Sequence, residues 1–584
     1  MRRFQEGLAY PLLVRGELLR PGRCNAARVV GCCEVGAGVW QAGAVPFEDD
    51  LQSGGGRLAG DDWWRSAVIY QIYPRSFADS GGDGVGDLPG ITGRLDYLVD
   101  LGVDAVWLSP FYASPMVDFG YDITDHCVVD PVFGTLADFD GLLAAAHARG
   151  LRVLVDFVPN HTSNQHPWFA ESRSSRVSRR RDWYVWANPA PGGGPPNNWL
   201  SAFPAAGSAW TLDEPTGQYY LHSYTTAQPD LNWHNAEVRA AMADVLRFFL
   251  DRGVDGFRID AAHRLIKDPT LAGNPPDVAG ARTALAPGGR RLRHIDQPGV
   301  HTVLRELRAV LAGYGGDRLL LGEVGVADPA RWAAYYGHDD ELTLPLNFGF
   351  WSQPFTAAGF RTAVGTTEGV LPPGAWPIYA LGNHDLPRLA SRYDDGRHRQ
   401  ARARLAAMLL LTLRGTPLLY YGDEIGMTDV SIPPESTVDS NGRDPARTPM
   451  QWDATGGAGF TTGRPWLPIP ASAPTVNVAV ERDEPGSLLN LYRDLIGLRR
   501  GHPVLRNGDY QALAPTQPAL YAYLRRTGGQ RILVMLNFDD HPHDLDHPEV
   551  GTGRILLSTH DRPLPGSLHT LRLAPYEGVI ASLT

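Results

Sequence analysis

Residues 256–260 read Gly-Phe-Arg-Ile-Asp, a short and mostly apolar run that ends in an acidic residue. Similar runs recur along the chain, separated by stretches of helical periodicity such as the one from Val238 to Phe249, which Asn235 can cap. Continuous apolar runs are typical of strands buried on both faces, and strands that alternate with helices are parallel. The other runs lie at 68–73, 105–108, 153–155, 319–321, 378–381 and 417–421, with a weaker one at 342–346. Eight such strands predict an α/β fold, a closed (β/α)8 TIM barrel rather than an open sheet.

Two segments interrupt this alternation. The first follows the third strand, is rich in Pro, Gly, Asn and Trp, and is too long for an ordinary loop, so it predicts an inserted subdomain. After residue 501 the helical pattern stops, and short apolar segments separated by turn residues predict an antiparallel β-sandwich. The sequence therefore predicts a disordered or peripheral N-terminal extension at 1–61, the barrel at 62–158 and 225–500, the inserted subdomain at 159–224 and the sandwich at 501–584.

Composition excludes several classes of partner. The 584 residues carry 53 Lys and Arg against 64 Asp and Glu, a net charge of −11 without a basic stripe, which argues against nucleic acids and anionic membranes as partners. No 18-residue apolar run without charges occurs, and the start lacks the apolar core of a signal peptide. The four Cys form no disulfide framework. We therefore expect a cytoplasmic protein that binds a small, neutral ligand, and its oligomeric state stays open.

Four acidic residues follow predicted strands: Asp156, Asp260, Glu323 and Asp385. In a barrel, catalytic groups lie at the C-terminal ends of the strands, so we expect these carboxylates to converge at one mouth. Crowded like charges raise one another's pKa, and burial adds to this effect. Such an arrangement is typical of a site where a proton must be held and then released.

Two of these acids fit complementary roles. Arg258 lies two residues before Asp260, so both side chains point to the same face of the strand and the guanidinium should keep Asp260 ionised, as a nucleophile requires. Glu323 has no Arg near it in sequence and is the candidate for a raised pKa and for the general acid. Two carboxylates about 5–5.5 Å apart are the requirement for glycoside hydrolysis with retention. Asp385 would then accept hydrogen bonds from sugar hydroxyls, with His161 and His384 as neutral donors.

Six ordered motifs narrow the identification. They are Asp156-Phe-Val-Pro-Asn-His161, Gln228-Pro-Asp-Leu-Asn232, Gly256-Phe-Arg-Ile-Asp260, Gly322-Glu323, Asn383-His-Asp385 and Arg443-Asp-Pro-Ala-Arg-Thr-Pro-Met-Gln-Trp452. With these motifs, residues from about 63 to 584 resemble the α-amylase family of glycoside hydrolases (family 13), in its α-glucosidase and oligo-1,6-glucosidase branch. Each motif alone is a weak signal, whereas six in order are a strong one.

The resemblance implies a role for each site residue. Asp260 would be the nucleophile, Glu323 the acid/base and Asp385 the stabiliser of the transition state, with no cofactor required for the chemistry. The resemblance also implies a subsite for the non-reducing glucose that is lined by Asp118, Tyr121, His161, Phe203, Arg258, His384 and Arg443. Asp118 and Arg443 would pair across the 4-hydroxyl of this glucose and block longer chains, which makes the enzyme exo-acting.

Ala261 bears on the linkage that is cleaved. In this branch the residue after the nucleophile tends to be Val in α-1,6-cleaving enzymes and Ala or Thr in α-1,4-cleaving ones. A smaller side chain leaves room at the next sugar, so the sequence favours maltose-like α-1,4 substrates. A contact of this size is worth only about 1–3 kcal/mol, so the specificity can remain broad.

A loop after the first strand resembles the family's calcium loop. Asp79, Asp83, Val85 and Asp87 stand at the positions of oxygen ligands that would surround a structural Ca²⁺ or Mg²⁺. Gly81 stands where the family has Asn, so one ligand is missing and the site should be weaker or completed by water.

Two other functions stay open. A transglycosylase or isomerase on the same scaffold would share the covalent intermediate and differ in how water is excluded, and the motifs do not separate it from a hydrolase. The Arg-Leu-Asp-Arg stretch of the sucrose isomerases is absent from the sequence, which argues against that version. A non-catalytic scaffold, like the transporter heavy chains that keep this barrel, would have lost the acids that are present here as Asp260 and Glu323.

Overall fold

A computed structural model describes residues 62–584 except 285–289, 546, 548–549, 562–567 and 569–570. The extension predicted at 1–61 lies outside the described residues. The boundaries that the sequence analysis gives to the other regions stay predictions.

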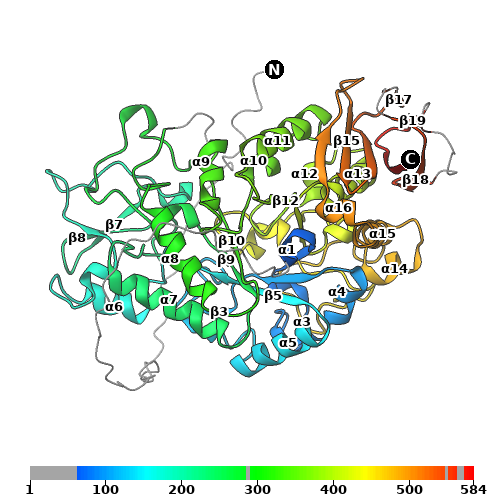
Figure 1. The fold of residues 1–584 in the computed structure, drawn as a ribbon. Helices are drawn as coiled ribbons and strands as arrows, with labels where there is room; N and C mark the ends of the chain where they lie inside the picture. Colours follow the sequence, from blue (N-terminus) through cyan, green and yellow to red (C-terminus); the bar gives the residue numbers. More distant parts are fainter. Residues whose placement is uncertain (1–61, 285–289, 546, 548–549, 562–567, 569–570) are drawn as a thin grey trace. The chain divides into compact units, whose positions relative to one another are not determined.

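Eight parallel strands form the central sheet of the described chain (Figure 1). Their order is β11-β10-β9-β5-β2-β1-β13-β12, so the first strand pairs with both the second and the last, as a barrel requires. The strands are β1 (Ile69–Ile72), β2 (Ala105–Leu108), β5 (Arg152–Phe157), β9 (Gly256–Ile259), β10 (Leu319–Gly322), β11 (Leu344–Pro345), β12 (Ile378–Ala380) and β13 (Thr416–Tyr420). Each coincides with one of the apolar runs, so the predicted eight-stranded α/β fold is confirmed.

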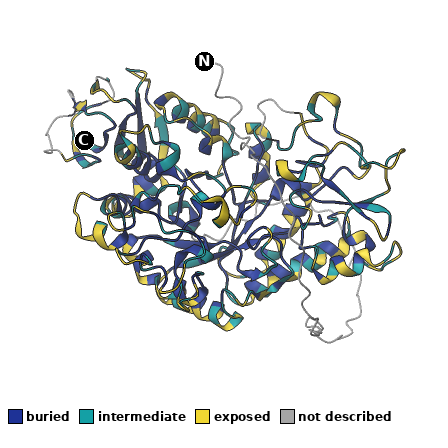
Figure 2. Ribbon diagram, turned by 180° about the vertical axis from the view of Figure 1, so that it is seen from behind, coloured by how far each residue is buried: buried dark blue, intermediate teal, exposed yellow. Residues whose placement is uncertain are grey.

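Helices cover the outside of this sheet, and Figure 2 shows buried strands inside and exposed residues on the outer helix faces. In α7 (Ala236–Leu250), for example, Val238 and Met242 are buried, and the Asn235 side chain caps the helix by accepting from the Glu237 amide over 2.8 Å.

No helix of the described residues is long and apolar enough to cross a membrane. The other helices are α1 (Trp63–Ser66), α2 (Pro74–Phe77), α3 (Leu88–Thr92), α4 (Leu95–Leu101), α5 (Leu136–Ala148), α8 (Val300–Ala312), α9 (Pro329–Ala333), α10 (Phe348–Trp351), α11 (Ala357–Val370), α12 (Leu389–Arg392), α13 (Arg399–Thr412), α14 (Val478–Asp483), α15 (Leu488–Gly501) and α16 (Pro503–Asn507).

The insertion after β5 has its own small sheet and core. It contains α6 (Pro167–Arg173) and three antiparallel strands in the order β6 (Trp186–Ala187), β8 (Gln218–Leu221) and β7 (Trp210–Asp213). Trp199, Trp210 and Tyr219 belong to its apolar core. The insertion is joined to the loop after β9, because Asn198 Nδ2 donates to the Asn274 carbonyl over 2.9 Å and Asn198 Oδ1 accepts from the Asn274 amide over 2.7 Å. A further hairpin, β3 (Tyr112–Ala113) and β4 (Asp125–Val129), follows β2.

The C-terminal region is built from antiparallel strands, as predicted. Five of them form a sheet in the order β14 (Asp509–Ala512), β15 (Leu520–Thr527), β16 (Gln530–Asn537), β20 (Gly578–Leu583) and β18 (Gly553–Ser558). A second sheet pairs β17 (His543–Leu545) with β19 (Leu571–Leu573), and both sheets contribute to one apolar core, for example through Leu533 and Leu573. Thr412 at the end of α13 connects this region to the barrel, because its carbonyl accepts from Arg525 over 2.7 Å.

Candidate functional site

Arg258 lies inside β9 and occupies the centre of the candidate site. Its side chain is 1% exposed and contacts carboxylates from three neighbouring strands. Nη1 donates to Asp156 Oδ1 over 2.7 Å and to Asp260 Oδ1 over 2.9 Å, and Nη2 donates to Glu323 Oε2. The strand register explains this convergence, because Asp156 is the partner of Arg258 across β5 and β9, and Glu323 follows directly after β10. One cation therefore holds three carboxylates at the C-terminal end of the barrel.

The predicted contact between Arg258 and Asp260 is present, and Arg258 also binds Glu323, which has no Arg near it in sequence, because β9 and β10 are adjacent strands. The prediction that Arg258 keeps Asp260 ionised does not agree with the burial of this carboxylate. Instead, burial raises the pKa of Asp260 well above its ordinary value, and the opposing charge of Arg258 is shared with two other carboxylates. Burial also raises the pKa of Asp156 to about 6. Burial therefore opposes ionisation of Asp156 and Asp260, whereas the charge of Arg258 favours it.

Asp385, five residues after β12, has the opposite electrostatic environment. Its Oδ1 accepts from Arg443 Nη1 over 3.1 Å and from Arg447 Nη2 over 2.9 Å, and its Oδ2 lies 3.3 Å from His384 Nε2. Burial acts to raise the pKa of Asp385, but His384, Arg443 and Arg447 hold that pKa well below its ordinary value. The side chain is 37% exposed. Asp385 is therefore an ionised carboxylate with an accessible surface.

The ion pair predicted between Asp118 and Arg443 is present. Arg443 Nη2 donates to Asp118 Oδ1, and Asp439 holds the same guanidinium through a bond of 2.9 Å from Nε. Gln228 Nε2 donates to the other Asp118 oxygen over 2.9 Å. Arg443 also binds Asp385. The Asp118–Arg443 pair, which is predicted to close the glucose subsite, is therefore linked to the predicted stabiliser of the transition state.

Tyr121 connects the histidines to the acids. Its ring stacks on His384 with centroids 5.3 Å apart, and its hydroxyl lies 2.7 Å from His384 Nε2 and donates to Asp156 Oδ2 over 3.1 Å. Burial lowers the pKa of His384 to about 3, so this imidazole is neutral at physiological pH. His161 contacts the same residue through Nε2, which lies 3.1 Å from the Tyr121 carbonyl oxygen.

The two remaining predicted residues complete this arrangement. The Phe203 ring lies under the Arg443 guanidinium, 5.3 Å from centroid to Cζ. Ala261 is fully buried in the left-handed region at φ 47°, and its amide points to Glu323 Oε2 over 3.4 Å. All predicted catalytic and substrate-binding residues thus belong to one connected network.

Asp156, one of the four acids expected at the barrel mouth, belongs to this network, although no role was predicted for it. Four further members were not predicted. Gln228 and Arg447 lie within the quoted motifs, so that signal could have found them. Asp439, which holds Arg443, and Tyr224, whose ring contacts both Phe203 and His161 with centroids 5.3 Å apart, lie in loops without a sequence signal.

The carboxylates of the predicted metal loop accept hydrogen bonds from other groups of the protein. Asp79 accepts three hydrogen bonds, from the Gly82 and Gly84 amides and the Thr461 hydroxyl, and Asp87 accepts four, from Ser80, Gly81 and Gly90. Asp83 accepts from the Val85 amide over 2.9 Å. A carboxylate has about four acceptor positions, so Asp79 and Asp83 keep some capacity for a cation, whereas the four bonds to Asp87 use its capacity. Metal binding at this loop stays a prediction.

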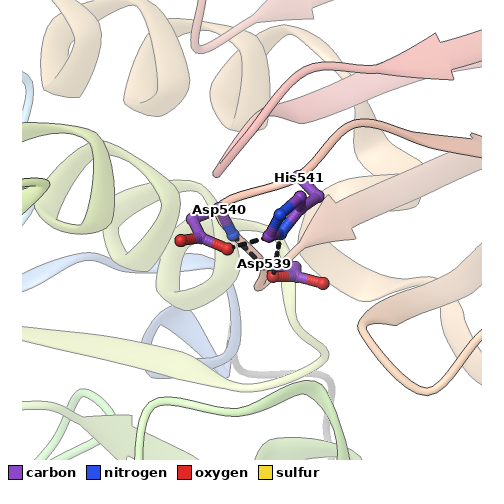
Figure 3. Close-up of side chains that lie close together, drawn as sticks. All are labelled: Asp539, Asp540 and His541. Atoms are coloured by element: carbon purple, nitrogen blue, oxygen red, sulfur yellow. Dashed lines mark hydrogen bonds and ion pairs between the residues drawn. The ribbon is translucent and has the colours of Figure 1, made fainter.

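A different group of potential metal ligands lies between β16 and β17 (Figure 3). Asp539, Asp540 and His541 bring their side chains together there. His541 Nδ1 lies 2.6 Å from Asp540 Oδ1 and 3.4 Å from Asp539 Oδ1, and Asp539 Oδ2 lies 2.9 Å from His543 Nε2. These residues pair with one another on an exposed loop, so we assign no function to the group.

Comparison with known proteins places the site among carbohydrate-active enzymes. Residues 71–508 match the family described as alpha amylase, catalytic domain, and residues 510–580 match maltogenic amylase, C-terminal domain. An oligo-1,6-glucosidase of Parageobacillus thermoglucosidasius is 39% identical over 88% of this chain and 98% of its own. A probable alpha-glucosidase of Rhizobium meliloti is 42% identical over 82% of this chain and 90% of its own. The crystal structure of the alpha-glucosyl transfer enzyme XgtA matches with a TM-score of 0.82 and 41% identity, over 89% of this chain and 99% of that one.

Proposed function

The chain belongs to the α-amylase family of glycoside hydrolases, and on this basis we propose that it is a retaining, exo-acting α-glucosidase. It would release α-glucose from the non-reducing end of short α-glucosides and favour α-1,4 links. The observation that carries the proposal is the contact of Asp260 and Glu323 with one Arg258, while Asp385 is bound by a separate pair of Arg residues.

The reaction would proceed by double displacement. Asp260 attacks the anomeric carbon as Glu323 donates its proton to the departing glycosidic oxygen, which yields a covalent glucosyl-enzyme and an alcohol. Glu323, now ionised, takes a proton from a water molecule. The water oxygen bonds to the anomeric carbon, the bond between that carbon and Asp260 breaks, and α-glucose is released. Asp260 must be ionised when it attacks. Glu323 must carry the proton that it donates to the glycosidic oxygen.

The other residues would orient the sugar. Asp385 is held ionised by Arg443 and Arg447, so it can accept hydrogen bonds from ring hydroxyls and stabilise positive charge at the anomeric centre. The ion pair of Asp118 and Arg443 would bind the terminal 4-hydroxyl and leave no passage for a longer chain. This closed end supports exo action.

The linkage preference rests on Ala261. It is fully buried next to Glu323, where a larger side chain would reduce the space for the sugar that leaves. The relatives named above include both an oligo-1,6-glucosidase and a probable alpha-glucosidase, so the preference for maltose over isomaltose is our proposal from this one contact.

A second candidate function is glucosyl transfer. It is favoured by the 41% identity to XgtA, whose name describes α-glucosyl transfer. The covalent intermediate is common to both reactions, and a sugar or alcohol instead of water would take the glucosyl group.

Proton NMR of the products from maltose and from isomaltose, each at low and high concentration, tests these proposals. We expect α-glucose to appear first and faster from maltose, and no turnover by the Asp260→Asn variant. First release of β-glucose would exclude the covalent mechanism, and new disaccharides in dilute substrate would favour transfer. Absence of turnover by the wild type on both sugars would contradict the enzymatic proposal.

A further inference from the structure

Lys267 is the single lysine of the chain, and it is buried next to the candidate site. It follows the short helix η3 (Ala262–Arg264) and has an exposure of 3%. Its ammonium group donates to Asn160 Oδ1 over 2.7 Å, lies 2.9 Å from Asp230 Oδ2 and donates to the Arg264 carbonyl. An ammonium group has three N–H donors, so each has an acceptor. A buried charge with this complete set of partners holds a defined geometry.

The three acceptors come from separate segments. Asn160 belongs to the loop after β5, Asp230 to the segment that leaves the insertion, and Arg264 to the turn after β9. Asp230 is itself fully buried, and its Oδ1 accepts from the Ser223 amide over 2.8 Å and from Asn160 Nδ2 over 3.2 Å. Lys267 therefore fixes the position of Asn160 relative to the strand end that carries Asp260.

Lys267 prevents the side-chain amide of Asn160 from exchanging the positions of its oxygen and nitrogen. Its oxygen accepts from the ammonium group, so its nitrogen faces Asp230 and also His161 Nδ1, at 3.1 Å. His161 Nδ1 must then accept. A neutral imidazole has one N–H, which therefore lies on Nε2 and donates to the Tyr121 carbonyl oxygen over 3.1 Å.

The contact with Gln228 favours the other tautomer of His161. Its amide oxygen accepts from Thr225, so its Nε2 is a donor, and that nitrogen lies 3.0 Å from His161 Nε2. If the oxygen and nitrogen of the Asn160 amide exchanged positions, His161 could carry its proton on Nδ1 and donate it to the Asn160 oxygen. Its Nε2 could then accept from Gln228 Nε2. The choice between the two tautomers thus depends on the orientation of Asn160.

We propose that Lys267 is a positioning residue that fixes the Asn160 amide and thereby selects the Nε2-protonated tautomer of His161. Because His161 lies in the proposed glucose subsite next to Tyr121 and Gln228, this tautomer sets the hydrogen-bond pattern presented to the sugar. The consequence for the sugar rests on the proposed function, whereas the tautomer can be measured without any substrate.

The test uses ¹⁵N NMR of histidine-labelled full-length protein, with the His161 signals identified by comparison with His161→Gln. We expect the wild type to carry the proton on Nε2, and a proton on Nδ1 would overturn the proposal. The double variant Lys267→Met with Asp230→Asn removes both buried charges and frees Asn160. We expect a mixed or Nδ1-protonated His161 in this variant, and restoration of the wild-type tautomer when Arg replaces Lys267 alone.

Binding of the iminosugar 1-deoxynojirimycin, measured by calorimetry, provides the functional readout. We expect at least a 10-fold weaker Kd in the double variant. The matched control removes the Arg173–Asp213 ion pair of the insertion, with Arg173→Met and Asp213→Asn, and should keep the wild-type Kd. A double variant with the wild-type tautomer and Kd would overturn the proposal. If the wild type neither binds the iminosugar nor cleaves maltose, the proposed function fails, and the tautomer still decides the role of Lys267.

Discussion

Arg258 and Glu323 are in direct contact, although their positions in the chain are 65 residues apart. The contact arises because β9 and β10 are adjacent, with Leu321 opposite Arg258 and Glu323 directly after the strand. The same guanidinium also binds Asp260, so the two acids proposed for the chemistry share one cation. Any change of Arg258 therefore alters both carboxylates at once.

Replacement of Arg258 by Lys tests this relationship. A single ammonium group keeps the charge but cannot bridge three carboxylates, so we expect kcat/KM on maltose to fall by about 10²- to 10³-fold, as for the loss of one oriented donor. The acidic limb of the pH profile should also move to higher pH, because an ammonium group that cannot contact all three carboxylates stabilises their ionised forms less. Steady-state kinetics from pH 4 to 8 measure both effects. Arg239→Lys, which alters an exposed ion pair with Glu306, is the control, and equal activity of both variants would contradict the expectation.

The strands of the barrel were predictable because each is a continuous apolar run, buried on both faces, with helical periodicity between runs. The residues Asp260, Glu323 and Asp385 were predictable for the same reason, since each follows such a run. The contact of Arg258 with Asp260 followed from the period of one strand, whereas its contacts with Asp156 and Glu323 could not be predicted. Contacts between side chains of adjacent strands depend on register, and register does not appear in the periodicity of one strand.

Loop residues were harder to predict. Asp439 holds Arg443 only because the chain after β13 returns to the barrel mouth, and Tyr224 reaches Phe203 only through the fold of the insertion. Neither position has a periodic pattern or an unusual neighbour in sequence. At the loop of Asp79 the spacing predicts a metal, and the fold also brings amide donors to the same carboxylate, which the spacing does not show.

Removal of Asp118 should change both activity and chain-length preference. Asp118→Ala loses the carboxylate that pairs with Arg443, and a hydrogen bond to a charged group is worth about 1.5–3 kcal/mol, so kcat/KM on maltose should fall by roughly 10- to 150-fold. The ratio of kcat/KM on maltoheptaose to that on maltose should rise, because the end of the subsite opens. Asp96→Ala, which removes an exposed ion pair with Arg149, serves as the control. A proportional loss on both substrates would show that Asp118 does not close the subsite.

Enlargement of Ala261 tests the proposed linkage preference. Ala261→Val adds two methyl groups at a fully buried position next to Glu323, so we expect the ratio of kcat/KM on maltose to that on isomaltose to fall by about 10-fold or more. The melting temperature should also fall, because a β-branched residue is strained at φ 47°. Ala262→Val, the equally buried neighbour, controls for general packing effects. An unchanged ratio would remove Ala261 from the determinants of specificity.

The stability of the loop at Asp79 should not require a bound metal. Because its carboxylates accept hydrogen bonds from amides and Thr461, we expect dialysis against EDTA to leave the melting temperature within about 1 °C, and Asp79→Ala to lower it through the loss of three hydrogen bonds. Differential scanning fluorimetry with EDTA and with added Ca²⁺ measures both. A large drop with EDTA that Ca²⁺ reverses would restore the predicted structural cation.

Glu481 should make stability depend on pH. Burial raises its pKa to about 7, although its Oε2 accepts from the Leu489 amide over 3.0 Å. Because this folded-state pKa lies above the ordinary value, the contribution of Glu481 is complete below about pH 4.5 and is lost as the pH rises through 7, by up to about 3 kcal/mol. Glu481→Gln keeps an acceptor for Leu489 without the charge, so its unfolding free energy should equal that of the wild type at pH 4.5 and exceed it at pH 8. Urea denaturation at several pH values tests this, with Glu435→Gln, at an exposed position away from Glu481 in sequence, as control. A constant difference between variant and wild type across this range would show that Glu481 ionises without cost in the fold.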